Sequence, residues 1–156
     1  MAYPLDGSPK RWAILESIKS KLSLIASPSY HHDVARVDIY ETQRMALGTA
    51  MPAIAIVPGE DTLVRNLSCY AEDRSLGVDI YGAIRHNTRD EAWKLECNWL
   101  MSDIRRALSQ DMQLDGTSVW VEFTDQTVFD AVDSNFAVCS VGLSVVYRHS
   151  FSDPTQ

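Results

Sequence analysis

Near the start of the chain, apolar residues recur every three or four positions, which is the spacing of one face of an α-helix. This stripe consists of Trp12, Leu15, Ile18, Leu22 and Ile25. Ser8 suits an N-cap, and Pro9 suits the first helical position, where its missing N–H costs nothing. The pattern predicts a helix that starts at Ser8-Pro9 and runs to about Leu24.

A second helical stripe carries the strongest local signals in the sequence. Thr88 and Glu91 form a capping box, in which the hydroxyl covers the backbone N–H of Glu91 and the carboxylate reaches back. The apolar positions that follow at helical spacing are Trp93, Cys97, Leu100, Ile104 and Leu108. We expect this helix to run to about Ser109, with a turn at residues 114–117.

Three segments have the pattern of β-strands. Residues 34–40 alternate between apolar and polar, as a half-buried strand does. Residues 53–57 are apolar on both faces and lie between Pro52 and Pro58, which predicts a short central strand. Residues 136–147 alternate over a longer stretch and predict the last strand of the chain.

A hairpin and a further strand complete the sheet. Residues 63–85 are β-like, with a polar break at Glu72-Asp73-Arg74 that we interpret as the hairpin turn before a second arm at 76–84. Residues 119–123 predict a short strand. The order of elements predicts an α+β fold, with an antiparallel or mixed β-sheet and two helices packed on one face.

The sequence is that of one domain spanning residues 1–156, because no repeat and no Gly/Ser/Pro-rich linker divides it. We expect residues 1–8 to be a flexible N-terminal arm and residues 149–156 a C-terminal tail. The longest apolar stretch, Ala50 to Val57, is far shorter than the roughly 20 residues that span a bilayer. The N-terminus also lacks the apolar segment of a secretory signal. We therefore expect synthesis inside the cell and no membrane partner.

His31-His32-Asp33 is the one cluster in the sequence with the character of metal ligands. Adjacent residues on a strand or loop point in different directions, so they rarely meet at one ion without distant partners. A polar turn is the ordinary interpretation, and a small metal-dependent cytoplasmic enzyme using these three residues is the alternative. No Gly-x-Ser-x-Gly, Walker or Gly-x-Gly-x-x-Gly motif occurs. We predict no enzyme, no catalytic residue, no metal and no cofactor.

The cysteines and one tryptophan complete the candidate residues. Cys69, Cys97 and Cys139 are odd in number and widely spaced, which is typical of free thiols in a reducing compartment. Cys97 and Cys139 occupy apolar positions, so we expect both to be small buried side chains. Trp99 does not share a helix face with Trp93 and is a candidate for the core edge or for an interface with another chain.

The negative charge is concentrated in one part of the chain. The net charge is −7 with a pI near 4.9, which argues against tight binding of nucleic acid phosphates. Between Ala107 and Tyr147 there are acids but no lysine or arginine. We expect Asp125, Asp130 and Asp133 to lie on a loop between the last two strands. This acidic cluster is either solvated, or it faces a lumen or a neighbouring subunit.

The order of these elements resembles a known family. The residues that carry the resemblance are the Pro-Ala-Ile strand at 52–54, the helix containing Asp103-Ile104-Arg105-Arg106-Ala107-Leu108, the turn at 114–117 and a closing strand that ends at 146–148. In this order they are similar to the tail terminator (minor tail protein U-like, tail completion) proteins of long-tailed bacteriophages. The resemblance covers residues 11–148. The acidic excursion at 125–133 is longer than the family pattern suggests.

The resemblance implies a structural virion protein of the phage tail and neck, assembled in the host bacterial cytoplasm. Such proteins form hexameric rings that cap the tail tube, stop its polymerisation and join the head-side connector. Their partners would be further copies of the chain, the tail tube protein and the connector, with double-stranded DNA passing through the lumen without specific binding. The alternative within the same class is another neck or head–tail connector subunit, or a tail-tube-like protein.

Overall fold

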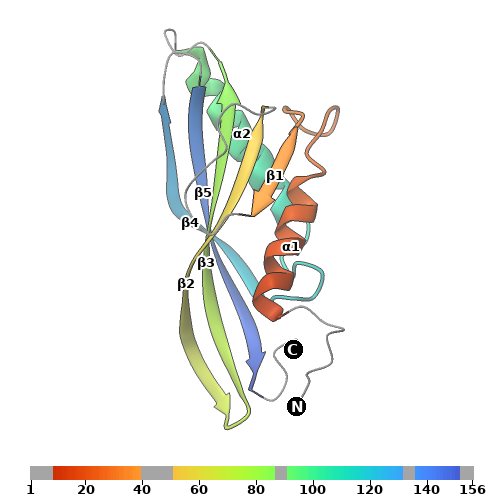
Figure 1. Ribbon diagram of the computed structural model, residues 1–156, viewed down its shortest axis with the longest axis vertical. Coiled ribbons are helices and arrows are strands. Elements are labelled where there is room, and N and C mark those ends of the chain that lie inside the picture. Colours follow the sequence, from red (N-terminus) through yellow and green to blue (C-terminus); the bar gives the residue numbers. More distant parts are fainter. Residues whose placement is uncertain (1–8, 40–50, 87–90, 132–135, 152–156) are drawn as a thin grey trace.

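The structure is a computed structural model. It describes residues 9–39, 51–86, 91–131 and 136–151; for residues 125–131 it describes only the backbone. The described residues form two helices and five strands, in the order α1-β1-β2-β3-α2-β4-β5 (Figure 1). Their bounds are α1 (Lys10–Leu22), β1 (Arg36–Ile39), β2 (Ala53–Ser68), β3 (Ala71–Arg85), α2 (Ala92–Ser109), β4 (Trp120–Ala131) and β5 (Phe136–Ser150).

The five strands form one mixed sheet in the order β1-β2-β3-β5-β4. β1 pairs with β2 in parallel, and the other neighbours are antiparallel. β3 and β5 pair without a register shift from Ala71↔Ser150 to Arg85↔Phe136, so these two strands are the continuous centre of the sheet. The predicted α+β class, with a mixed sheet and two helices on one face, is confirmed (Figure 1).

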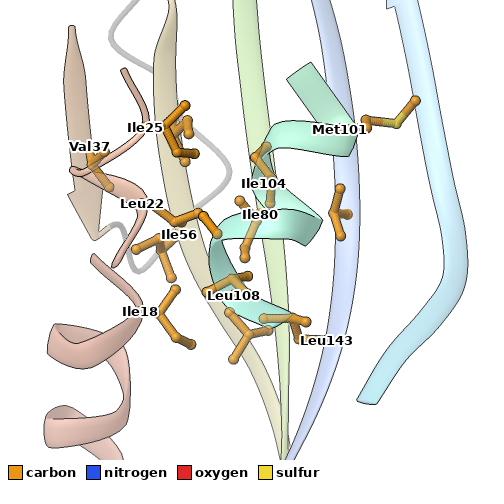
Figure 2. Close-up of a cluster of buried hydrophobic side chains, with 14 of the residues drawn as sticks. Ile18, Leu22, Ile25, Val37, Ile56, Ile80, Met101, Ile104, Leu108 and Leu143 are labelled. Atoms are coloured by element: carbon orange, nitrogen blue, oxygen red, sulfur yellow. The ribbon is translucent and has the colours of Figure 1, made fainter. Parts of the chain in front are cut away.

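The core lies between the two helices and the sheet face that they cover (Figure 2). The whole predicted stripe of α2 is buried there, from Trp93 to Leu108. In α1 the buried apolar residues are Ile14, Leu15, Ile18 and Leu22, and Ile25 just beyond the helix is buried too. Trp12 was expected on this stripe, but its side chain is 45% exposed, and Ile14 occupies the core in its place.

Gly82 of β3 sets how closely α2 approaches the sheet. A Cβ atom at this position would lie 2.6 Å from Cδ2 of Leu100 and 3.1 Å from Sγ of Cys139. Leu100 and Cys139 are both fully buried, so neither side chain can move into free space. The absence of a side chain at residue 82 therefore allows the apolar face of α2 to contact the centre of the sheet.

The hairpin differs from the sequence prediction in the position of its turn. The two strands are joined at Cys69-Tyr70, whereas Glu72-Asp73-Arg74, which we predicted to be the turn, lies inside β3. Asp73 and Arg74 are tolerated in a strand because side chains of neighbouring strands pair with them, and Glu72 pairs with Arg74 on the same strand. β2 likewise does not stop at residue 57: it continues through Pro58, beyond the point where β1 ends. Proline is accepted in a strand whose outer edge is unpaired.

β4 and β5 are also longer than predicted. β4 extends to Ala131 rather than 123, so most of the expected acidic loop is strand. Its pairing shifts between Phe123 and Thr127, which places a bulge at 124–126. β5 continues to Ser150, two residues into the expected C-terminal tail. The expected N-cap residues Ser8 and Thr88 and the N-terminal arm 1–8 lie outside the described residues, as does the remainder of the C-terminal tail.

Substitution of Gly82 by alanine is expected to lower the free energy of unfolding by about 1–3 kcal/mol, because the new methyl group overpacks the contact with Leu100. Gly77→Ala on the same strand is the matched control, since the nearest atom to its Cβ is at 3.6 Å. We expect this control to change stability by less than about 1 kcal/mol. Urea denaturation of both variants measures the difference, and equal effects would contradict the role assigned to Gly82.

Candidate functional site

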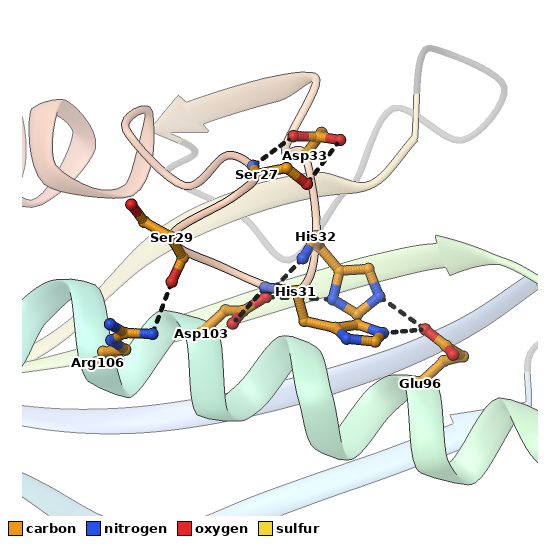
Figure 3. Close-up of polar contacts among 8 residues, drawn as sticks. All are labelled: Ser27, Ser29, His31, His32, Asp33, Glu96, Asp103 and Arg106. Carbon is orange, nitrogen blue, oxygen red and sulfur yellow. Dashed lines mark hydrogen bonds and ion pairs between the residues drawn. The ribbon is translucent and has the colours of Figure 1, made fainter.

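His31 and His32, in the segment between α1 and β1, converge on Glu96 of α2 (Figure 3). Nε2 of His31 lies 3.3 Å from Oε2 of Glu96, and Nε2 of His32 lies 3.0 Å from the same oxygen. The three potential ligand atoms are all within 4.8 Å of one another. Two imidazoles that are adjacent in sequence therefore meet a carboxylate from a distant part of the chain at one point on the surface.

A buried carboxylate on α2 holds this histidine pair in place. Asp103 is 5% exposed and accepts hydrogen bonds from the backbone N–H groups of His31, at 3.1 Å, and of His32, at 2.9 Å. Its Oδ2 also lies 3.3 Å from Nδ1 of His32. Because a buried carboxylate without partners is costly, these contacts tie the segment firmly to the helix.

Asp33, the third residue of the sequence cluster, does not join the histidines (Figure 3). Its carboxylate accepts hydrogen bonds from the backbone N–H of Ser27 at 2.6 Å and from the hydroxyl of the same serine at 3.4 Å. The hypothesis of a site made of His31, His32 and Asp33 is therefore wrong in its third member. The reason is the one given for adjacent residues in general: their side chains leave the backbone in different directions.

Glu96 and Asp103 were missed from the sequence, although a signal for them exists. Glu96, Trp99, Asp103 and Arg106 follow one another at spacings of three, four and three, which places them along one side of α2. This side faces the segment after α1: besides the contacts of Glu96 and Asp103, Nη1 of Arg106 donates to the carbonyl of Ser29 at 2.6 Å (Figure 3). A helix that carries a polar stripe beside its apolar stripe is expected to contact a second segment of the chain through polar side chains, in addition to the apolar core.

Trp99 lies next to the histidine pair and is 45% exposed. Its ring stacks on the imidazole of His31 with a centroid distance of 4.8 Å and an interplanar angle of 11°. One side of the indole thus supports His31, while the remaining surface is accessible. Its use as an interface with another chain stays a prediction.

The three acids of the predicted cluster do not occupy one described loop. Asp125 lies in the bulge of β4, and Asp130 pairs in register with Val138 of β5. Asp133 lies outside the described residues. Asp130 lies five positions after Asp125 in β4, a distance of roughly 15 Å along an extended chain. Whether these acids face a lumen or a neighbour stays a prediction.

Two other acids of the same segment have partners within the chain. Asp111 and Asp115 both contact Nζ of Lys21 on α1, at 3.1 and 3.2 Å, and Ser17 donates to Asp115 at 2.6 Å. Hydrogen bonds from the Asp115 backbone N–H and from Lys21 lower the pKa of Asp111. Part of the acidic segment therefore serves to hold the turn after α2 against α1.

The buried cysteines behave as predicted. Cys97 and Cys139 are fully buried and free, and they face each other across the contact between α2 and β5. The contact with Cys97 and burial raise the pKa of the Cys139 thiol, which keeps it protonated and unreactive. Cys69 is exposed in the turn between β2 and β3.

The distal parts of β2, β3 and β5 form an arm, which we define as residues 58–75 and 148–150, that runs past the end of α1 (Figure 1). Asp73 is 2% exposed and joins three strands of the arm: its carboxylate contacts Nε of Arg65 at 2.8 Å and Nε of Arg148 at 3.0 Å. In a second network, Arg74 contacts Asp61 and Glu72, both at 2.8 Å. Charge pairing therefore stiffens a part of the sheet that lies beyond the core.

The arm also carries exposed apolar side chains. Leu63 is 50% exposed, Val64 51% and Tyr70 70%. Among the described strands β1 pairs only with residues 53–56 of β2, so the outer edge of β2 beyond that point has no strand beside it. β4 is the opposite edge of the sheet, and its Trp120 is 56% exposed. In the described part of the chain, these two edges therefore combine backbone without a partner strand and exposed apolar side chains.

No family model matches the sequence, and no curated protein matches it. Neither helix in the described part of the chain is long and apolar enough to span a membrane. Function is therefore inferred from the residues themselves.

Stability should fall on acidification because of Asp73. Burial by itself would raise the pKa of this carboxyl, but hydrogen bonds from Arg148 and Arg65 outweigh it and hold the pKa below its ordinary value of 3.8. A carboxyl with a lowered pKa in the folded state stabilises the fold above its ordinary pKa, and this contribution is lost as the pH falls through the folded value.

Asp73→Asn is expected to lower stability at neutral pH by about 1–3 kcal/mol and to flatten the decline below about pH 4. Denaturant midpoints across this pH range measure both effects. Glu60→Gln, which removes one exposed carboxylate from the same arm, is the charge-matched control. A variant that declines with acid as steeply as the unchanged protein would contradict the role of Asp73.

Proposed function

We propose that this protein is a ring-forming structural subunit of a long-tailed bacteriophage, namely its tail terminator. Rings of the chain, which we expect to be hexameric, would cap the tail tube, stop its polymerisation and join it to the head-side connector. The observation that carries the proposal is the pair of uncovered strand edges, β2 in the arm and β4 at the opposite side of the sheet.

Two different edges on one molecule suit a ring. If the β2 edge of one subunit meets the β4 edge of the next, the contact is heterologous, and it closes into a ring when the rotation between subunits allows it. Added strands satisfy the exposed backbone N–H and C=O groups, and the apolar side chains at both edges would be buried. The stiff charge networks of the arm favour such a contact because less conformational freedom is lost on association.

The remaining surfaces are consistent with this role. Both helices cover one face of the sheet, and on the other face half-buried residues such as Tyr81, Val138 and Ser140 alternate with the core positions. The net charge of −7 suits the wall of a passage through which DNA moves without binding. A neck or connector subunit, or a tail-tube-like protein, would use the same edges, and antibody labelling along the virion distinguishes these locations from that of a terminator.

Assembly is tested by placing a charge at each edge in turn. Val64→Arg on β2 and Trp120→Arg on β4 should each abolish the rings seen by electron microscopy and light scattering, in the presence of tail tubes if the ring closes only on its template. Each variant keeps one intact edge, so a mixture of the two should form heterodimers and no rings. Leu95→Arg, at a 59% exposed apolar position on α2, is the control and should assemble normally.

Monomers of the unchanged protein at high concentration, with no ring on tubes or connectors, would refute the proposal. Rings formed as readily by both edge variants as by the unchanged protein would refute the assigned edges. Heterodimers in the mixture would show that the contact joins unlike surfaces.

Neutralisation of the acidic cluster gives a separate test. The triple substitution Asp125→Asn, Asp130→Asn and Asp133→Asn should alter ring assembly or DNA passage, because these acids are proposed to face the lumen or a neighbouring subunit. Glu16→Gln, Glu60→Gln and Glu91→Gln together remove the same charge from exposed positions elsewhere and serve as the control. Normal behaviour in both assays would mean that the acidic cluster is merely solvated.

A further inference from the structure

The convergence of His31, His32 and Glu96 points to a use that the ring-forming role does not include. We propose that these three side chains bind a divalent transition-metal ion, with zinc as the preferred ion. The ligands come from two places in the fold: the histidines precede β1, and the glutamate lies on α2 (Figure 3). The proposal is independent of ring formation.

The two distances between the imidazoles and Glu96 suit a tetrahedral ion, and the three ligand atoms all lie within 4.8 Å of one another, so the imidazoles need to shift toward each other when the ion binds. Ligand atoms about 2.0–2.1 Å from a tetrahedral zinc ion lie roughly 3.3 Å from one another. The two Nε2 atoms lie 3.3 and 3.0 Å from Oε2 of Glu96, close to this value. The side chain of His31 is 40% exposed, so its ring can adjust when the ion enters.

A set of supporting contacts orients the histidines. Nδ1 of His32 faces Oδ2 of the buried Asp103 at 3.3 Å, and when Nδ1 carries the proton, Nε2 presents its lone pair to the ion. Asp103 also fixes both histidines through their backbone N–H groups. His31 is supported by the stacked ring of Trp99. A carboxylate behind a metal-binding imidazole is the usual arrangement in metal sites, since it fixes the tautomer and the ring orientation.

Space for a further ligand lies beside the cluster. His32 and Glu96 line a pocket of about 150 Å³ together with His86, which is large enough for water. Three protein ligands and one water complete a tetrahedral zinc site. Imidazole nitrogens favour zinc and similar transition metals over calcium and magnesium, which prefer oxygen ligands alone.

A bound ion would link two separate parts of the fold. It would join the segment after α1 to the exposed side of α2, adding to the hydrogen bonds of Asp103. Because an ion that binds only the folded chain stabilises it by mass action, zinc should raise the melting temperature.

The test uses the untagged full chain, freed of metal with a chelator and titrated with zinc chloride by calorimetry. We expect one zinc ion per chain, and binding at least about tenfold weaker in each of His31→Ala, His32→Ala and Glu96→Gln, since each loses one ligand. His149→Ala and Cys69→Ser, which remove an imidazole and an exposed thiol elsewhere, should bind as the unchanged protein does.

A second readout separates loss of binding from loss of folding. Circular dichroism establishes that each variant is folded without metal, and at the same zinc concentration the rise in melting temperature should be smaller for Glu96→Gln than for the unchanged protein. Cobalt added in place of zinc should give the intense visible absorption of a tetrahedral site. Failure of the unchanged protein to bind zinc, or binding of normal strength in any folded variant of the three ligands, overturns the proposal and leaves a hydrogen-bonded cluster without metal.

Discussion

The apolar side chains of α1 and α2 are buried against the same face of the sheet, and the close approach of α2 at Gly82 fixes the depth of that layer. Since both helices lie on one side, the core cluster fills that face of the sheet, and among the described strands none pairs with the outer edge of β4 or with the outer edge of β2 beyond residue 56. The core also extends only as far along the strands as the helices reach. Both candidate functional regions follow from this division: the histidine cluster lies where the polar side of α2 meets the preceding segment, and the arm lies where the strands outrun the helices.

The features predicted correctly from the sequence are those that depend on periodic burial. The stripe from Trp93 to Leu108 and the apolar run at 53–57 identified their elements because residues on one face of a regular element share one environment. Glu72, Asp73 and Arg74 misled the prediction because polar residues in a row are typical of a turn. Here Asp73 pairs with residues on both neighbouring strands, Arg74 pairs with Asp61 on β2, and Glu72 pairs with Arg74. Such pairing depends on Arg65 and Arg148, which lie on other strands and cannot be assigned as partners beforehand.

In the histidine cluster too, the partners of a residue could not be assigned from the sequence. His31 and His32 stood out in the sequence, but their partner Glu96 lies 64 residues further along and meets them only because α2 packs beside the segment after α1. Asp33 was the neighbour in sequence and not in space. The helical spacing of Glu96, Trp99 and Asp103 was visible without a structure, yet only their position against a specific segment turns that spacing into a site.

The separation of the arm from the core has a consequence for how this protein can change over time. Leu63, Val64 and Tyr70 contribute exposed surface and little to the packed interior, so their replacement would alter the surface of the arm proposed to meet a neighbouring subunit at small cost to folding. The residues that do hold the arm together, Asp61, Asp73 and Arg74, are tied to charges on neighbouring strands and must change together with them. Lineages of such a chain can therefore diverge quickly in the surface offered to a partner while the frame that presents it stays constant.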